Sequence, residues 1–544
     1  MRAFDLRTAD QRIVLSKIDW IGLLLIVVLL GVAGMYLSMA LRTDPFGDYS
    51  PLVDDAYIPL RYAQNAADGF GLVWNPGGPR VQGYSSQLHL LTLIVFEKLG
   101  LTALAWAPLF GALCAVVSMA LTVVLLRQLN PRRQPENLVG AILLGLSPQF
   151  WFWSLAGLET TLFAVLVLAS VLAYLGKMSG RLPAWCAGAL FALCGLTRPE
   201  GALLFAFTLA FDAALAWREE PRKWRSTLGM LAGFAAIYLP VFVWQGLYFG
   251  DLLPNTYYAK TGAGWIQIRG GWNYLFASLA DVFAYSLVPL LLVLVSLGKR
   301  PLERLYVAFV LVGACILIVL EGGDHFGNAR FLAPFLPLVF VLATLGLSEL
   351  TRRLTRVRAA LCVGVLVSLA VLAFRQSSAP TVEPGWAELP KADSQALAFL
   401  GDWVAGFRVM GRTLRQIATP DQSIGVVPIG AIGYFSGMQV IDMTGLTDPV
   451  IAHEPFDPDY VTSWRPGHDK GDGPYVLRQQ PDFIQLVDRL TSQPFPGVDE
   501  FGEQYKSVME IWNAPEFERL YEFYPVRVRG GWYYNLYRLK SNPG

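Results

Sequence analysis

The sequence has few charged residues for its length, and this scarcity excludes several classes of protein. Only 16% of its 544 residues are charged, whereas 54% are hydrophobic, and the mean hydropathy is +0.43. A soluble globular protein carries roughly 25% charged residues. The composition therefore excludes a soluble enzyme, a disordered protein and a coiled coil, and it indicates a polytopic membrane protein.

Several functional motifs are also missing. The net charge is +1 and sustained runs of Lys or Arg are absent, so nothing suggests a nucleic-acid partner. No Walker-type phosphate loop is present, so a reaction must draw its energy from an activated substrate. No Cys-x-x-Cys spacing occurs, which argues against a thiolate metal site. All five cysteines lie within apolar runs, at Cys114, Cys186, Cys194, Cys315 and Cys362.

Uncharged stretches long enough for a membrane-spanning helix of ~20 residues recur along the first 378 residues. The first run is too long for a signal-peptide core and no small-residue cleavage site follows it, so we expect an uncleaved span. We predict about eleven transmembrane helices. Their expected ranges are Trp20–Leu41, Leu101–Leu126, Asn137–Leu158, Thr160–Lys177, Leu182–Thr197, Gly201–Trp217, Ser226–Gly250, Val282–Gly298, Leu305–Leu320, Phe331–Ser348 and Ala359–Phe374.

The placement of Lys and Arg predicts the orientation. With the N-terminus in the cytoplasm, the inner loops hold 20 basic residues and the outer loops before the C-terminal part hold nine. Cytoplasmic loops are normally the basic ones. An odd number of spans then places the C-terminal part outside. We therefore expect a multi-pass protein of a bacterial cytoplasmic membrane, with the C-terminal part and the polar outer loops on the periplasmic side.

A change in charge divides the chain into two predicted domains. The membrane part, residues 1–378, has a net charge of +8, and residues 379–544 have no cysteine and a net charge of −7. We expect the second part to be a soluble extracytoplasmic α/β domain that begins near Ala379–Pro384. Strand-like runs are Ser423–Pro428, Gln439–Met443 and Trp532–Leu539, and helical patterns are Ala396–Ile417 and Pro481–Leu490.

The first outer loop, residues 42–100, is long enough to suggest a function. Asp54 and Asp55 lie at the start of an expected short helix that ends at Gly69. One Asp could simply cap this helix. Two adjacent carboxylates at the edge of the hydrocarbon are costly and usually functional, so we predict a catalytic base among them. Tyr57, Asn75 and Tyr84 of the same loop are candidate substrate contacts, although the latter two could equally be turn residues.

Shorter polar elements recur on the same expected side of the membrane. They contain the candidate substrate-binding residues Glu159, Glu200, Asn255, Asp324 and His325, beside the cations Arg198, Lys260 and Arg330. Interhelical ion pairs and ordinary turns would explain any one of these elements. Taken together they suggest a polar site, in which the three cations could bind a phosphate at the headgroup level. The neighbouring aromatic residues suit sugars and prenyl chains, so the pattern favours glycosyl transfer from a lipid-linked donor.

Seven motifs carry a family resemblance. They are Asp54–Ile58, Gly157–Thr160, Thr197–Gly201, Leu253–Lys260, Gly322–Asp324 with Arg330, Asp442–Asp448 and Gly467–Lys470. Together they resemble the bacterial C-type (GT-C) membrane glycosyltransferases, particularly the terminal arabinofuranosyltransferases of actinobacterial cell walls. A similar enzyme class modifies type IV pilins.

The resemblance implies a C-type fold and a polyprenyl-phosphate donor, with decaprenylphosphoryl arabinofuranose as the expected sugar carrier. It also implies that Asp54 and Asp55 are the catalytic carboxylates, without deciding which of them is the base. The expected acceptor is a cell-wall glycan of the arabinan or lipoarabinomannan type. Whether the reaction inverts or retains the anomeric configuration stays open.

Three further candidates and a cofactor remain. Asp442 and Asp448 could orient an acceptor or close a turn, and His468 could bind substrate or be a hydrogen-bonded structural residue. No cofactor is certain; a divalent cation could bind the hard oxygens of Asp54, Asp55 and Asp324.

Two other functions compete with glycan transfer. One is a protein O-glycosyltransferase of the pilin type that uses the same donor. The other is a non-catalytic transporter of lipid-linked sugars, which should place polar residues within broken spans. Asp212 is the main charged residue inside a predicted span.

Overall fold

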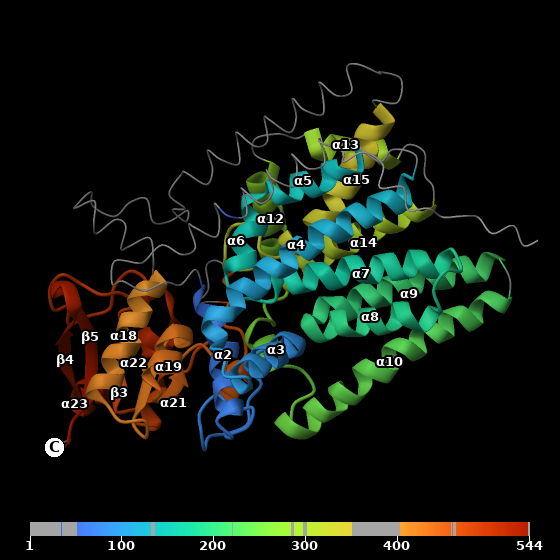
Figure 1. Cartoon of the computed structure of the whole chain (residues 1–544). Coiled ribbons are helices and arrows are strands. Elements are labelled where there is room, and N and C mark those ends of the chain that lie inside the picture. Colours follow the sequence, from blue (N-terminus) through green and yellow to red (C-terminus); the bar gives the residue numbers. More distant parts are fainter. Residues whose placement is uncertain are drawn as a thin grey trace, which may run out of the picture.

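In the computed structural model the chain folds into a long helical bundle joined to a smaller part that contains a β-sheet (Figure 1). The structure describes Gly34 and residues 52–541, apart from 132–135, 220, 284–287, 298–301, 351–402, 459 and 461–463. The predicted spans Trp20–Leu41 and Ala359–Phe374 lie outside these ranges.

Six described helices are long and apolar enough to cross a membrane, or seven if one bent pair counts as a single span. The chain is thus a multi-pass membrane protein, as its composition predicts. The six are α4 (Ala103–Leu129), α7 (Thr160–Met178), α9 (Pro199–Glu219), α10 (Pro221–Phe249), α14 (Leu302–Glu321) and α15 (Leu336–Leu350), the last preceded by the short turn η3 (Ala333–Phe335).

The bent pair replaces the predicted straight span Asn137–Leu158. The turn η1 (Glu136–Leu138) leads into α5 (Val139–Gly145), and α6 (Pro148–Leu155) follows at an angle of 57°. Pro148 cannot donate a backbone hydrogen bond, and the Ser147 hydroxyl accepts one from the backbone N–H of Phe150 at 3.4 Å. Proline after a capping serine starts a new helix, which explains the break.

The remaining helices of the bundle are shorter or less apolar. The predicted spans Leu182–Thr197 and Val282–Gly298 are represented by 14 and 9 residues. The sequence patterns did not predict α3 or α12. These elements are α3 (Gln87–Lys98), α8 (Ala184–Thr197), α11 (Asn255–Ala259), α12 (Trp265–Phe283) and α13 (Val288–Ser296).

The C-terminal part is an α/β unit with a five-stranded sheet in the order β2-β1-β3-β5-β4. Strand β1 is parallel to β2 and β3, and β5 is antiparallel to β3 and β4. The strands are β1 (Ser423–Val426), β2 (Gln439–Asp442), β3 (Phe483–Ile484), β4 (Tyr521–Arg527) and β5 (Tyr533–Leu539). The helices are α18 (Trp403–Ile417), α19 (Ile429–Ser436), α20 (Pro449–His453), α21 (Gly473–Arg478), α22 (Lys506–Trp512) and α23 (Pro515–Leu520).

The helix predicted over Pro481–Leu490 is wrong. Phe483 and Ile484 pair with β1 on one side and β5 on the other, so they fill the middle of the sheet. This pairing buries both side chains, and tertiary pairing of this kind overrides a weak helical pattern.

Helix α2 (Asp54–Ala67) connects the two parts. It begins at the predicted acidic pair, and Figure 1 shows it between the bundle and the sheet-containing part. Tyr57 of α2 packs on Tyr434 and Phe435 of α19, with ring centroids 5.7 and 5.6 Å apart. The candidate site therefore lies at the junction between the membrane bundle and the C-terminal part.

Candidate active site

Asp54 and Asp55 have different partners although they are adjacent. Both carboxylate oxygens of Asp54 accept backbone N–H groups of α19, from Gly430 at 3.0 Å and from Ala431 at 2.7 Å. The N-cap residue of α2 is Val53, which has no side-chain cap. Asp54 therefore caps a helix, but that helix is α19. Burial raises the pKa of Asp54 to about 6, although the hydrogen bond from Ala431 opposes the rise.

The opposite end of α19 is held by Arg61, which also belongs to α2. Its guanidinium donates to the carbonyls of Gly433 at 2.5 Å and Met438 at 2.6 Å, and its Nε donates to the carbonyl of Trp74 at 2.8 Å. It also stacks on the Trp74 ring, 4.5 Å from the centroid. One helix of the first outer loop thus holds both termini of one helix of the C-terminal part.

Asp55 lies instead among cations. Its carboxylate is 3.5 Å from Arg330 Nη1 and is 19% exposed. Burial alone would raise the pKa of Asp55, but the charges of His325, Lys260 and Arg330 outweigh burial and lower it. Asp55 is therefore ionised at neutral pH, as a general base must be before it accepts a proton.

The loop that follows α14 places Arg330 beside Asp55. Gly322 and Gly323 have φ of +89° and +77°, and Asn328 and Ala329 have φ of +57° and +54°. A left-handed conformation is strained for alanine. Residues 328 and 329 reverse the direction of the chain, and Arg330 can therefore donate to Asp324 at 2.8 Å.

Two further interactions fix the loop. The Trp153 indole N–H donates to the carbonyl of Asn328 at 2.8 Å, and the Arg330 guanidinium lies 5.6 Å from the Trp153 ring. Burial alone would raise the pKa of Asp324. The charge of Arg330 and the contact with His325 outweigh burial and lower the pKa of Asp324.

Two histidines from distant segments meet beside this loop. The rings of His325 and His468 lie 4.5 Å apart, edge to face, and His325 Nδ1 is 3.2 Å from Asp324. Burial and the nearby charge of His325 lower the pKa of His468 to about 3, so His468 is neutral at physiological pH. Its Nδ1 lies 3.2 Å from the Pro466 carbonyl, which favours the tautomer with the proton on Nδ1 and a lone pair on Nε2.

Lys260 differs from the other two predicted phosphate ligands. It lies directly after α11 and is half-buried, and its charge lowers the pKa of Asp55. Within the described part of the chain, its ammonium makes no hydrogen bond and no ion pair. Gly467 lies against its stem, because a Cβ at that left-handed position would be 3.1 Å from Lys260 Cε. The C-terminal part therefore packs along the lysine without neutralising it.

Arg198 is already paired. It donates to Glu200 at 2.5 Å and to Glu159 at 3.3 Å, and all three side chains are at least nine-tenths buried. The Arg198 guanidinium lies 4.6 Å from the ring of Phe331, the residue that follows Arg330 in the chain. This triad neutralises Arg198, so it supports the candidate site from behind rather than offering a free cation.

The other predicted contacts connect the membrane part to the C-terminal part. Asn75 accepts from the N–H of Val440 and donates to its carbonyl, both at 2.9 Å, and so completes the free edge of β2. Asn255 donates to the carbonyls of Gly445 and Leu446 at 2.8 and 3.1 Å. These two residues therefore bind the C-terminal part, and the structure does not bring them to Asp55.

The remaining candidates lie within local structure. Tyr84 is buried against Tyr62, with ring centroids 4.9 Å apart. Asp442 accepts the N–H groups of Thr444 and Thr447 and closes the turn after β2. Asp448 caps α20.

The acidic residues proposed for a divalent cation do not fit one. Both Asp54 oxygens are occupied by backbone N–H groups, and Asp324 is paired with Arg330. Among the described residues, no cluster of three or more His, Cys, Asp or Glu side chains is placed to hold a metal ion.

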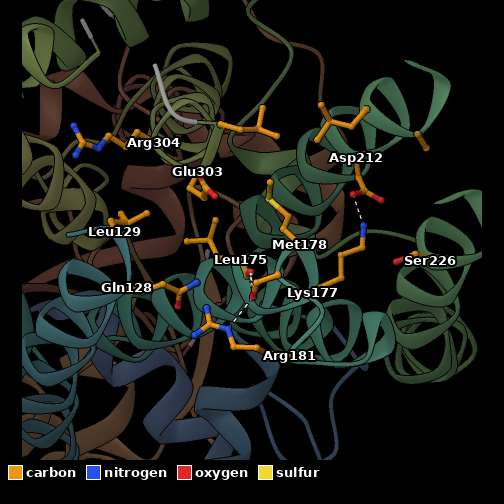
Figure 2. Close-up of a pocket in the computed structure, with 14 residues that line it drawn as sticks. Gln128, Leu129, Leu175, Lys177, Met178, Arg181, Asp212, Ser226, Glu303 and Arg304 are labelled. Carbon is orange, nitrogen blue, oxygen red and sulfur yellow. Dashed lines mark hydrogen bonds and ion pairs between the residues drawn. The ribbon is translucent and has the colours of Figure 1, made fainter. Parts of the chain in front are cut away.

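A cavity of about 690 Å³ lies at the other end of the bundle, where α7 and α9 end and α14 begins. Figure 2 shows Lys177 of its wall extending toward Asp212. Asp212 also accepts from the hydroxyls of Tyr174 at 3.0 Å and Thr227 at 2.7 Å. Asp212, the main charged residue inside a predicted span, is thus satisfied inside the bundle, and this cavity contains neither Asp54 nor Asp55.

Arg61 and Trp153 are the residues that the sequence patterns missed. For Arg61 a signal was available, because its spacing of seven residues from Asp54 on a helix places both on one face. Trp153 offered no such signal. Its contact with Asn328 joins segments 175 residues apart, and no local sequence signal could reveal it.

Comparison with solved structures finds a similar fold in C-type membrane glycosyltransferases. ArnT from Cupriavidus metallidurans bound to undecaprenyl phosphate aligns with a TM-score of 0.54 at 13% identity, over 85% of this chain and 93% of ArnT. The apo state of ArnT gives a TM-score of 0.51 at 14% identity, over 78% of this chain and 86% of ArnT. The expected resemblance to C-type enzymes is confirmed for the fold.

A second neighbour is the arabinofuranosyltransferase AftD from Mycobacteria, with a TM-score of 0.50 at 18% identity. The alignment covers 95% of this chain but only 42% of AftD, so the chain spans less than half of that protein. Residues 398–537 match a family described as a domain of unknown function, DUF8728. A comparison with curated protein sequences finds no match.

Proposed function

We propose that the chain is a membrane glycosyltransferase that moves a sugar from a polyprenyl-phosphate donor to an extracytoplasmic glycan. The observation that carries this proposal is an ionised Asp55 that lies beside Arg330 and feels the charge of Lys260, whose ammonium makes no hydrogen bond or ion pair within the described residues. Glycosyl transfer from a lipid phosphate needs a base for the acceptor and a cation for the leaving group. The shared fold with a protein that binds undecaprenyl phosphate supports the donor class.

In this proposal Asp55 takes the proton from an acceptor hydroxyl. The acceptor oxygen then forms a bond to the anomeric carbon, while the bond from that carbon to the phosphate oxygen breaks. The departing polyprenyl phosphate gains negative charge, which Lys260 and Arg330 stabilise. Asp54 positions Asp55, since it fixes the start of α2 against α19.

The identity of the sugar and the cellular location of the active site are proposed from sequence motifs and the shared fold. We propose D-arabinofuranose, carried by decaprenyl phosphate, because the motifs around Asp54, Arg198 and Lys260 resemble the arabinofuranosyltransferases and AftD shares the fold. The basic loops favour an active site on the periplasmic side of a bacterial inner membrane. Residues 1–378 would form the membrane module and residues 379–544 the extracytoplasmic domain.

Purified protein in nanodiscs, incubated with a panel of synthetic polyprenyl-phosphate sugars and octyl glycoside acceptors, tests the proposal. We expect wild-type protein to consume one donor and form polyprenyl phosphate. Asp55→Asn should lower kcat by at least ~100-fold. Asp68→Asn is the matched control, because Asp68 is an exposed acid at the opposite end of the same helix. Equal rates for Asp55→Asn and wild type would refute the role of Asp55, and consumption of no donor would refute the function.

A further inference from the structure

A second cavity lies on the same side of the molecule as the candidate site. It has a volume of about 420 Å³, is open to the surface, and is lined by residues 79–82, the end of α10, the segment before α11 and the start of α20. This volume lies within the roughly 300–1,000 Å³ of small-ligand pockets. Its walls include Arg80, Gln82, Phe249, Asp251, Leu253 and Asn255.

Two charged groups of this cavity are open to a ligand. The Arg80 guanidinium stacks on the Tyr248 ring, 4.5 Å from the centroid. Among the described residues it makes no hydrogen bond and no ion pair. The Asp251 carboxylate is 41% exposed, and the His453 ring nitrogen Nε2 lies 3.9 Å from it. The stacking limits the freedom of the guanidinium, so its N–H donors are held in place before a ligand binds.

The chemistry of these groups selects a neutral ligand rich in hydroxyl groups. One cation and one anion balance each other, so the cavity has no excess charge to attract a phosphate. A sugar hydroxyl both donates and accepts hydrogen bonds, so it can bind a carboxylate and a guanidinium together. Phe249 and Leu253 add an apolar surface against which the C–H face of a sugar ring can pack.

The cavity is joined to the candidate active site by one short helix. The Asn255 N–H donates to the Gln82 carbonyl at 3.0 Å, which fixes two walls of the cavity to each other. Asn255 starts α11, and Lys260 follows its last residue, Ala259. At 1.5 Å per residue, Asn255 and Lys260 are about 7.5 Å apart along the helix axis, which is close to the length of one or two sugar units.

We propose that this cavity binds the acceptor glycan, one or two sugar units away from the hydroxyl that reacts. This inference rests on the proposed function, because it identifies the subsite of that reaction's second substrate. A glycan bound between Arg80 and Asp251 would extend along α11 and present its reactive hydroxyl to Asp55. The ordered carbonyls of Gly445 and Leu446, held by Asn255, connect the subsite to the C-terminal part.

The test compares Arg80→Gln and Asp251→Asn with wild-type protein in nanodiscs. The probes are an octyl arabinofuranose disaccharide and octyl mannoside as acceptors, with the donor that the wild type consumes. We expect each substitution to raise the KM for the better acceptor by about tenfold, because each removes one charge-assisted hydrogen bond to the acceptor. The KM for the donor and the kcat should stay within about twofold. Arg478→Gln and Glu500→Gln are matched controls on exposed side chains.

The outcomes separate this inference from the proposed function. Normal transfer with an unchanged acceptor KM in both variants overturns the acceptor subsite alone. A raised donor KM with an unchanged acceptor KM also overturns it, since the cavity would then hold the donor. If wild-type protein consumes no donor, the proposed function fails. Saturation-transfer NMR with the octyl disaccharide then still tests whether the cavity binds an acceptor. If Arg80→Gln and Asp251→Asn bind the disaccharide as well as wild type does, the acceptor subsite is contradicted.

Discussion

Asp54 and Arg61 lie seven residues apart on α2 and bind opposite ends of α19. Seven residues span about 10.5 Å along a helix, close to the length of about 12 Å of the eight-residue α19. The negative group meets the N-terminus and the positive group meets the C-terminal carbonyls, so both complement the helix dipole. The position of Asp55 is therefore coupled to the docking of the C-terminal part.

Replacing Arg61 by methionine should weaken this docking. Met fills similar space but leaves the carbonyls of Gly433 and Met438 without their donor. We expect a loss of about 3 kcal/mol in the free energy of unfolding, measured by thermal unfolding in nanodiscs together with faster proteolytic release of the C-terminal part. Arg527→Met, on an exposed arginine of β4, is the control. Equal stability of the two variants would show that Arg61 does not hold α19.

The pH dependence of kcat distinguishes Asp55 from Asp54 as the base. A base works only when ionised, so kcat falls as the pH drops below its pKa. The pKa of Asp55 is lowered, so we expect kcat to change little between pH 7 and pH 4.5. If Asp54 were the base, its pKa of about 6 would reduce kcat by about 30-fold at pH 4.5. The kcat of wild-type protein measured from pH 4.5 to pH 7 checks this, and a fall of about 30-fold by pH 4.5 would contradict the assignment to Asp55.

Lys260→Gln should weaken donor binding without affecting the fold. The lysine ammonium makes no hydrogen bond and no ion pair among the described residues, and Asp55 keeps Arg330 as its ion-pair partner when the lysine is removed. Loss of a charge-assisted contact to phosphate should raise the KM for the donor by about 10- to 100-fold, with an unfolding temperature within about 2 °C of wild type. Lys98→Gln removes an exposed lysine of the first outer loop as a control. A normal donor KM in Lys260→Gln would exclude Lys260 from the phosphate site.

Sequence patterns predicted what depends on local chemistry. The apolar runs predicted the long apolar helices that the structure describes, and the acid pair was correctly predicted to begin a short helix, which is α2. The roles of individual polar residues could not be predicted in this way. Asn75 has the composition of a turn residue, yet its amide completes the edge of β2, which lies 365 residues away. Arg198 and Lys260 look equivalent as cations in outer loops, and only their neighbours separate them.

Arg198→Gln tests that separation directly. Its removal would leave Glu159 and Glu200 as two buried carboxylates without the ion-pair partner that they share. Breaking a buried ion pair by removing one partner costs about 3–5 kcal/mol, so we expect low yield of folded protein and a clearly lower unfolding temperature. The double variant Arg198→Gln with Glu200→Gln should recover part of the stability, because it also removes one of the two charges. The folded fraction should then bind the donor with a KM close to that of wild type. A stable Arg198→Gln protein with a strongly raised donor KM would instead place Arg198 in the phosphate site beside Lys260.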